Sequence, residues 1–113
     1  MRPRPTAVGY LRRDVSGISQ DWNEIQIRSV AQRLGYDLAK TVVFGRETDD
    51  PEGRLLNVIR AMDVDAVIVP NAVHLGGAIP DALVQECDVV TVSPENTYAR
   101  WPVPLRGLRV DGG

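Results

Sequence analysis

Ala66-Val67-Ile68-Val69 is a run of four apolar residues, most of them β-branched. Such a continuous run is typical of a strand that is covered on both faces, as in a parallel sheet. Similar runs occupy residues 6–11, 38–44 and 89–92, and each is bounded by polar, glycine or proline residues. The sequence therefore predicts four short strands.

Amphipathic segments separate these runs. Asp21-Trp22-Asn23-Glu24 has the pattern of a capping box, and a helix should follow it as far as Gly35, which suits a C-terminal position. Asp50-Pro51 predicts the start of a second helix, with aspartate as the N-cap and proline in the first turn. A third, shorter helix is expected near Pro80. The apolar positions fall at helical spacing, at residues 27, 30, 31 and 34, then 55, 58, 59 and 62, then 79, 82 and 83.

Strands and helices thus alternate along the chain, with short connections. Alternation of this kind indicates a parallel sheet with right-handed crossovers and helices on both faces. We expect a three-layer α/β sandwich with a central, mainly parallel four-stranded sheet over residues 1–94. Residues 95–113 lack a periodic pattern and are expected to form a partly disordered tail, in which Trp101, Leu105 and Leu108 are candidates to pack back onto the domain.

The length, amino-acid composition and net charge of the chain limit the classes of protein to which it can belong. A chain of 113 residues with 43% hydrophobic and 25% charged residues is ordinary for one globular domain. No apolar run has the length of a membrane span, and a single cysteine, Cys87, fits a reducing cytoplasm. The formal net charge of −2 and an isoelectric point of about 5.3 disfavour nucleic-acid binding, which depends on basic residues. We therefore expect a cytoplasmic protein without a membrane segment.

The carboxyl ends of the predicted strands are the expected place for a ligand, as in other open parallel sheets. The residues there that suit a small anion are Arg12, Arg13, Arg46, Asn71 and His74. These polar side chains equally fit ordinary solvated loops. His74 is the only histidine, which argues against a histidine-rich metal site, and no glycine motif for a nucleotide cofactor is present. We expect neither a metal nor a cofactor.

Three segments carry a resemblance to a known family. Tyr10-Leu11-Arg12, Gly45-Arg46-Glu47-Thr48-Asp49-Asp50-Pro51 and Val73-His74-Leu75-Gly76-Gly77 resemble the signature segments of the serine recombinase (resolvase/invertase) catalytic domain. The resemblance covers about residues 6–93 and implies a resolvase-like fold. It also implies a serine that attacks a DNA phosphate, assisted by several arginines.

The charged residues of that family are mostly replaced here. The family pattern Asp-Arg-Leu-Gly-Arg keeps only Leu75 and Gly76, and the arginine expected before Pro51 is Asp50. Without a gap the serine position is occupied by Asp14; with a two-residue insertion it falls on Ser16. Ser16 is then a relic of the nucleophile, or a loop serine without a role, and Arg12 is the one catalytic arginine that remains.

We therefore expect a degenerate, catalytically inactive domain that serves as a binding or regulatory module for a protein partner, with a second copy of the chain as one candidate. Loss of one transition-state cation commonly costs about a hundredfold in rate, and several are missing here. Two alternatives stay open. In one, Arg12, Arg13 and Arg46 hold a small anionic ligand or substrate in a refitted cleft; in the other, the protein is a DNA-associated recombination factor.

Overall fold

A single five-stranded sheet organises the computed structural model, which describes residues 4–102. The spatial order of the strands is β2-β1-β3-β4-β5. Neighbouring strands are parallel from β2 to β4, and β5 runs antiparallel to β4. The strands are β1 (Thr6–Arg12), β2 (Asp37–Phe44), β3 (Ala66–Val69), β4 (Asp88–Thr91) and β5 (Asn96–Tyr98).

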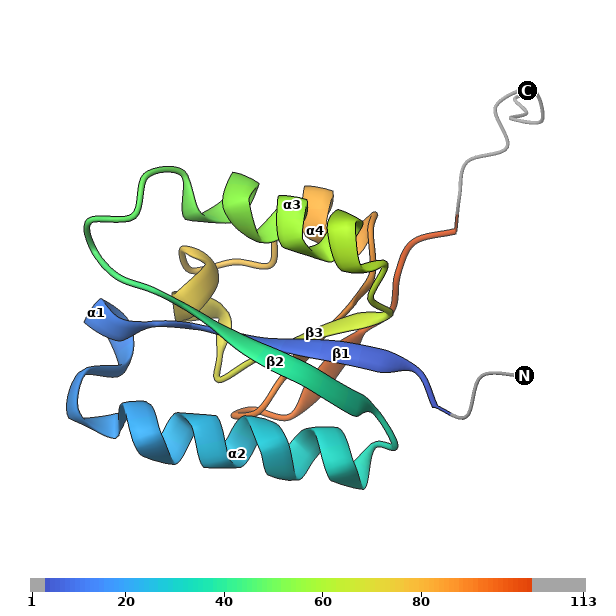
Figure 1. The fold of residues 1–113 in the computed structure, drawn as a ribbon, viewed down its shortest axis with the longest axis horizontal. Coiled ribbons are helices and arrows are strands. Elements are labelled where there is room, and N and C mark those ends of the chain that lie inside the picture. Colours follow the sequence, from blue (N-terminus) through green and yellow to red (C-terminus); the bar gives the residue numbers. More distant parts are fainter. Residues whose placement is uncertain (1–3, 103–113) are drawn as a thin grey trace.

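Helices cover both faces of this sheet, as Figure 1 shows. The long helix α2 lies on one face, and α3 and α4 lie together on the other. The predicted three-layer α/β architecture is therefore confirmed. The helical elements are α1 (Arg13–Ser16), η1 (Gly17–Ser19), α2 (Gln20–Arg33), α3 (Pro51–Met62), η2 (Ala72–Leu75) and α4 (Asp81–Val84).

The apolar run in β3 lies at the centre of the protein. All four residues are inaccessible to solvent, as predicted for a strand covered on both faces. Ala66 and Ile68 belong to the core beneath α2, and Val67 and Val69 to the core beneath α3. This alternation follows from the two-residue period of a strand, so one short segment contributes to both apolar cores.

The sheet has five strands rather than the predicted four, and it continues past residue 94. The additional strand β5 lies within the segment expected to be a tail, and Thr97 pairs with Val90 of β4. All three residues of β5 are exposed, so the strand has no buried face and no apolar alternation. Hydrogen bonding to an available sheet edge forms it, and a hydropathy pattern cannot reveal that. Leu105 and Leu108 lie outside the described residues.

The helix starts differ in how well the sequence predicted them. Asp50 is the N-cap of α3, as expected, and its carboxylate accepts a hydrogen bond from the Gly53 amide at 3.2 Å. The prediction of a capping box that begins at Asp21 is wrong. Helix α2 begins at Gln20, Asp21 lies in its first turn, and the N-cap Ser19 makes no side-chain capping bond. The helix starts two residues earlier than predicted, because α1 and η1 lead into it directly.

The predicted apolar faces are largely buried, with exceptions at their ends. Ile27, Val30 and Ala31 of α2 are buried, but Leu34 is 40% exposed and Met62 of α3 is 36% exposed. Both exposed residues belong to the last turn or cap of their helix, where the sheet no longer lies opposite. Over residues 4–102, no helix combines the length and apolar character that a bilayer crossing requires.

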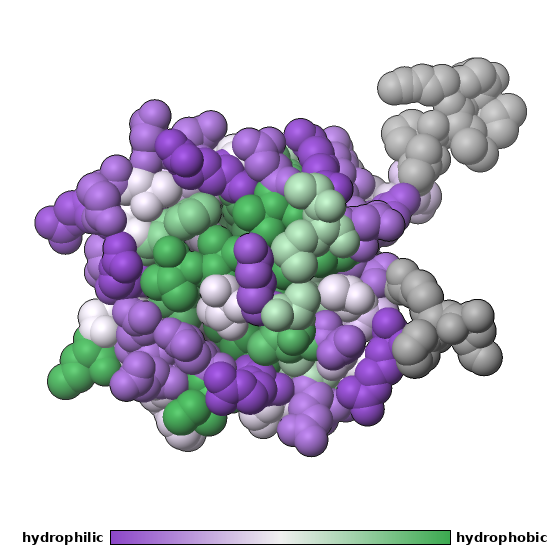
Figure 2. Space-filling view, viewed as in Figure 1, coloured by the Kyte–Doolittle hydropathy of each residue, from purple (hydrophilic) through white to green (hydrophobic). Residues whose placement is uncertain are grey.

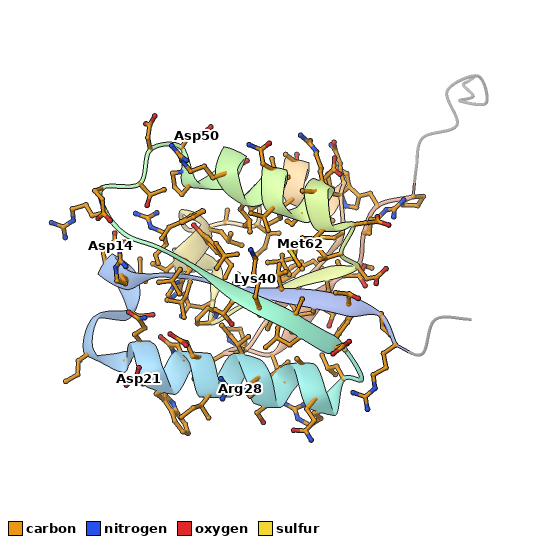
Figure 3. The ribbon with its side chains drawn as sticks, viewed as in Figure 1. Asp14, Asp21, Arg28, Lys40, Asp50 and Met62 are labelled. Carbon is orange, nitrogen blue, oxygen red and sulfur yellow. The ribbon has the colours of Figure 1, made fainter. Side chains whose placement is uncertain are left out.

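Strand β2 forms an edge of the sheet and carries an irregularity. Its pairing with β1 shifts between Ala7, opposite Leu38, and Val8, opposite Lys40, which leaves Ala39 as the extra residue of a bulge. Apolar residues gather over β2 and the adjoining side of α3, with a hydrophilic side chain in their midst (Figure 2). Figure 3 labels Lys40 at that position. A bulge and a lysine are common protections of an edge strand against pairing with another chain.

Candidate functional site

A pocket of about 260 Å³ lies at the carboxyl ends of β1 and β3. The start of α3 forms its third side, because the crossover from β2 brings that helix over the same end of the sheet. Figure 3 shows Asp50, the N-cap of α3, and Asp14, in α1 directly after β1, at this end of the molecule. The lining residues are Tyr10, Arg12, Asp50, Pro51, Glu52, His74, Leu75, Gly76 and Pro80.

His74 is a buried lining residue, with 2% of its surface exposed. The backbone N–H of Arg12 donates to His74 Nδ1 at 2.9 Å, which joins the end of β1 to η2. Burial lowers the pKa of His74, and the positive charge of Arg12 lowers it further. The imidazole is therefore neutral near pH 7. Because Nδ1 accepts a hydrogen bond, its proton lies on Nε2.

Tyr10 precedes Arg12 by two residues on β1, so both side chains lie on the same face of the strand. The phenol is 1% exposed, and its ring packs edge-to-face on Phe44 with centroids 5.7 Å apart. Burial raises the pKa of Tyr10, against a hydrogen bond from Arg12 and the charge of that residue, which lower it. The carboxylate of Glu52 also contributes to raising it. Tyr10 therefore stays protonated.

The guanidinium of Arg12 is occupied by a neighbouring carboxylate. Its Nε and Nη2 atoms donate to Asp14 at 3.1 and 3.0 Å, and both side chains are about four-fifths buried. Burial disfavours the charged form of Asp14, but hydrogen bonds from its own backbone and from Arg12 prevail and lower its pKa. A bidentate pair of this kind is among the stronger hydrogen-bonded contacts in proteins. The charge of Arg12 is thus largely compensated within the chain.

Ser16 does not line the pocket. It ends α1, is 9% exposed, and its hydroxyl donates to Asn23 Oδ1 of α2 at 2.7 Å. An amide oxygen accepts a hydrogen bond but is not a base that could activate a serine. The contact ties α1 to α2, and Ser16 and Arg12 are held by separate partners.

The other predicted ligand-binding residues lie elsewhere. Arg13 pairs with Glu47 at 3.0 Å on the exposed surface, and Arg46 is exposed beside Glu47. Asn71 caps η2 by accepting from the Val73 amide at 3.0 Å. Of the five predicted residues, the structure brings Arg12 and His74 to the pocket, and Arg13, Arg46 and Asn71 are not among its lining residues.

Tyr10 and Glu52 line the pocket but were not among the site residues expected from the sequence. The two-residue spacing of Tyr10 and Arg12 in a predicted strand was a usable signal, because it places both on one face. No comparable signal marks Glu52, whose position depends on how α3 crosses the sheet. Within residues 4–102, no group of three or more histidine, cysteine or acidic side chains is placed to hold a metal ion.

Comparison with known proteins adds no relative: no family model, curated protein or solved structure matches the chain. The functional interpretation therefore depends on the side chains of the site and on the surface around it.

Proposed function

We propose that this chain is a catalytically inactive domain of the serine recombinase type that acts as an interaction module. The observation that supports this most directly is the pairing of the two residues that strand cleavage would need. The Ser16 hydroxyl donates to Asn23, and the Arg12 guanidinium donates twice to Asp14. Neither group is available to a DNA phosphate.

The charges around the pocket support the same proposal. Phosphoryl transfer depends on cations that stabilise the non-bridging oxygens in the transition state. Here Asp50 and Glu52 line the pocket together with Arg12, and Asp14 compensates the charge of Arg12. A phosphate that approached this pocket would therefore meet a net negative potential. The same balance disfavours the alternative of a simple anionic ligand and that of a DNA-binding factor.

An adduct assay tests the inactive state. Purified protein is incubated with supercoiled and linear duplex DNA, and the products are separated under denaturing conditions. We expect no covalent protein–DNA species, whereas an active serine recombinase in parallel reactions should form one on its own site. An adduct that disappears in Ser16→Ala would refute the proposal.

The exposed side of α2 supports the interaction role. Ile18 is fully exposed, Trp22 is 59% exposed and Ile25 is 49% exposed. The spacing of Trp22 and Ile25 places both on the side of α2 opposite its buried face, and Ile18 lies in η1, which leads into the helix; we call Ile18, Trp22 and Ile25 the α2 stripe. Figure 2 shows apolar side chains protruding near the start of α2. Contiguous apolar side chains of this kind are a common mark of a protein contact.

Charge complementarity favours a second copy of the chain as the partner. Asp21 and Arg28, seen along α2 in Figure 3, flank the same side of the α2 stripe at a spacing of seven residues, and both are exposed. If two α2 helices pack antiparallel about a two-fold axis, Asp21 of each copy lies opposite Arg28 of the other. The apolar stripes then meet between these pairs, as in an isologous interface.

Sedimentation velocity over a range of concentrations tests this contact. We expect reversible dimerisation that is weakened by Trp22→Glu and by Arg28→Asp, and restored when Asp21→Arg is combined with Arg28→Asp. Met62→Glu is the matched control, because it adds the same charge at a partly exposed apolar position on a different helix. A wild-type protein that stays monomeric at the highest concentration reached would refute self-association through α2.

A further inference from the structure

Two buried polar groups of the pocket have hydrogen-bonding capacity that the described residues do not use. The Nε2–H of His74 lies opposite the nitrogen that accepts from Arg12, and no residue within 4–102 accepts from it. Arg12 influences the pKa of the Tyr10 phenol, and no acceptor for the phenol proton occurs in that part of the chain. A buried donor without an acceptor destabilises the folded protein. The floor of the pocket therefore offers two donors to an acceptor from outside the protein.

The side of the pocket formed by α3 carries hydrogen-bond acceptors rather than donors. Glu52 lines it from the first turn of α3, and no ion pair occupies its carboxylate within the described residues. Tyr10 and Glu52 line the same pocket of about 260 Å³, so one small ligand bound there lies between both groups. Asp50 adds a second carboxylate, already used in part as the cap of α3. Pro51, Leu75 and Pro80 contribute apolar lining to the same pocket.

We propose that this pocket binds a small zwitterion of the amino-acid type, with its carboxylate on His74 and Tyr10 and its ammonium group on Glu52. The inference depends on the function proposed above, because a pocket that still held a scissile phosphate would require the opposite charge on α3.

The arrangement disfavours ligands with only one of the two groups. A simple anion would satisfy the floor but would face the carboxylates of Asp50 and Glu52 without compensation. A simple amine would pair with Glu52 but would leave the His74 and Tyr10 donors buried and unused. A ligand with both groups satisfies each side and brings no net charge into the pocket. A charge-assisted hydrogen bond is also stronger than a neutral one, which favours an ammonium over a neutral amide at Glu52.

Titration of the protein with the standard L-amino acids, each at millimolar concentration, tests the proposal. Binding is measured from amide chemical shifts, with the Arg12 amide as the reporter because it is bonded to His74. We expect at least one amino acid to shift this resonance saturably. Its analogue without the amine and its carboxamide analogue should each bind at least about tenfold more weakly.

Two variants, each of which removes one exposed carboxylate, distinguish binding in the pocket from an effect of the net charge of the protein. Glu52→Gln should weaken amino-acid binding about tenfold or more, since it removes the partner of the ammonium group. Glu47→Gln changes the net charge equally but is outside the pocket, and it should leave the affinity unchanged. No saturable shift with any amino acid, or equal binding of the deaminated analogue, would overturn the proposal. The DNA-adduct assay is a separate measurement, so failure of amino-acid binding is distinguishable from failure of the proposed function.

Discussion

Replacement of His74 by alanine should be the most informative single change at the site. His74 accepts the Arg12 backbone N–H at 2.9 Å and is 2% exposed. The substitution removes the acceptor of a largely buried amide, at about 1–3 kcal/mol. It also leaves a cavity, and truncation of buried side chains of comparable size commonly costs about 2–5 kcal/mol in all. We therefore expect His74→Ala to lower the free energy of unfolding by about 3 kcal/mol.

The variant His74→Asn separates the hydrogen bond from the packing. An asparagine amide oxygen can accept the Arg12 N–H in place of Nδ1, while the side chain is smaller than imidazole. We expect His74→Asn to be more stable than His74→Ala by about 1–3 kcal/mol. Urea denaturation followed by far-ultraviolet circular dichroism at pH 7.5 measures both values. Equal loss in the two variants would refute a structural role for the Arg12–His74 hydrogen bond.

The same residue predicts the pH dependence of stability. The pKa of His74 is lowered in the folded protein, from an ordinary value of 6.5 in the unfolded chain. Between these two values the unfolded state binds the proton more readily, so the free energy of unfolding falls as the pH falls. The contribution is complete above about pH 6.5 and decreases as the pH approaches the folded pKa. His74→Asn should lack this decrease, and a parallel pH profile for the two proteins would contradict the explanation.

Three further predictions concern the scaffold. Gly9→Ala should lower the free energy of unfolding by about 1–3 kcal/mol in urea titrations, because its Cβ would lie 2.8 Å from both Ile27 Cγ2 and Thr41 Oγ1; a neutral effect would contradict the close approach of α2 to β1. Lys40→Val should increase light scattering by association through the β2 edge, while Lys40→Arg should not, and equal scattering would argue against a protective role for Lys40. The Cys87 thiol, with no exposed surface and a pKa raised to about 12 by burial, should react with a thiol reagent only as fast as the protein unfolds, and rapid labelling of folded protein would exclude that burial.

Local sequence patterns predicted the strands and helices of this protein, because each of these elements depends on residues that are neighbours in the chain. The period of β3 and the proline after Asp50 depend on side chains within one element, and the structure confirms both. Strand β5 was missed because it has no buried face, and Leu34 and Met62 were misjudged because helical spacing does not show where a helix extends beyond the sheet. The start of α2 was misplaced because α1 and η1 continue directly into it.

The sequence by itself determined the strands, the helices and their order in an α/β sandwich, because each of these follows from side chains that are neighbours in the chain. Only the tertiary structure decided which polar residues meet. His74 and Arg12 are separated by 62 positions in the chain and are joined by a hydrogen bond, whereas Arg13, adjacent to Arg12, points to Glu47 on the surface. The physical reason is that the direction of a side chain follows from its strand face and from the crossovers that bring distant loops together. Spacing along the sequence shows the strand face, but it does not show which distant loops the crossovers bring together.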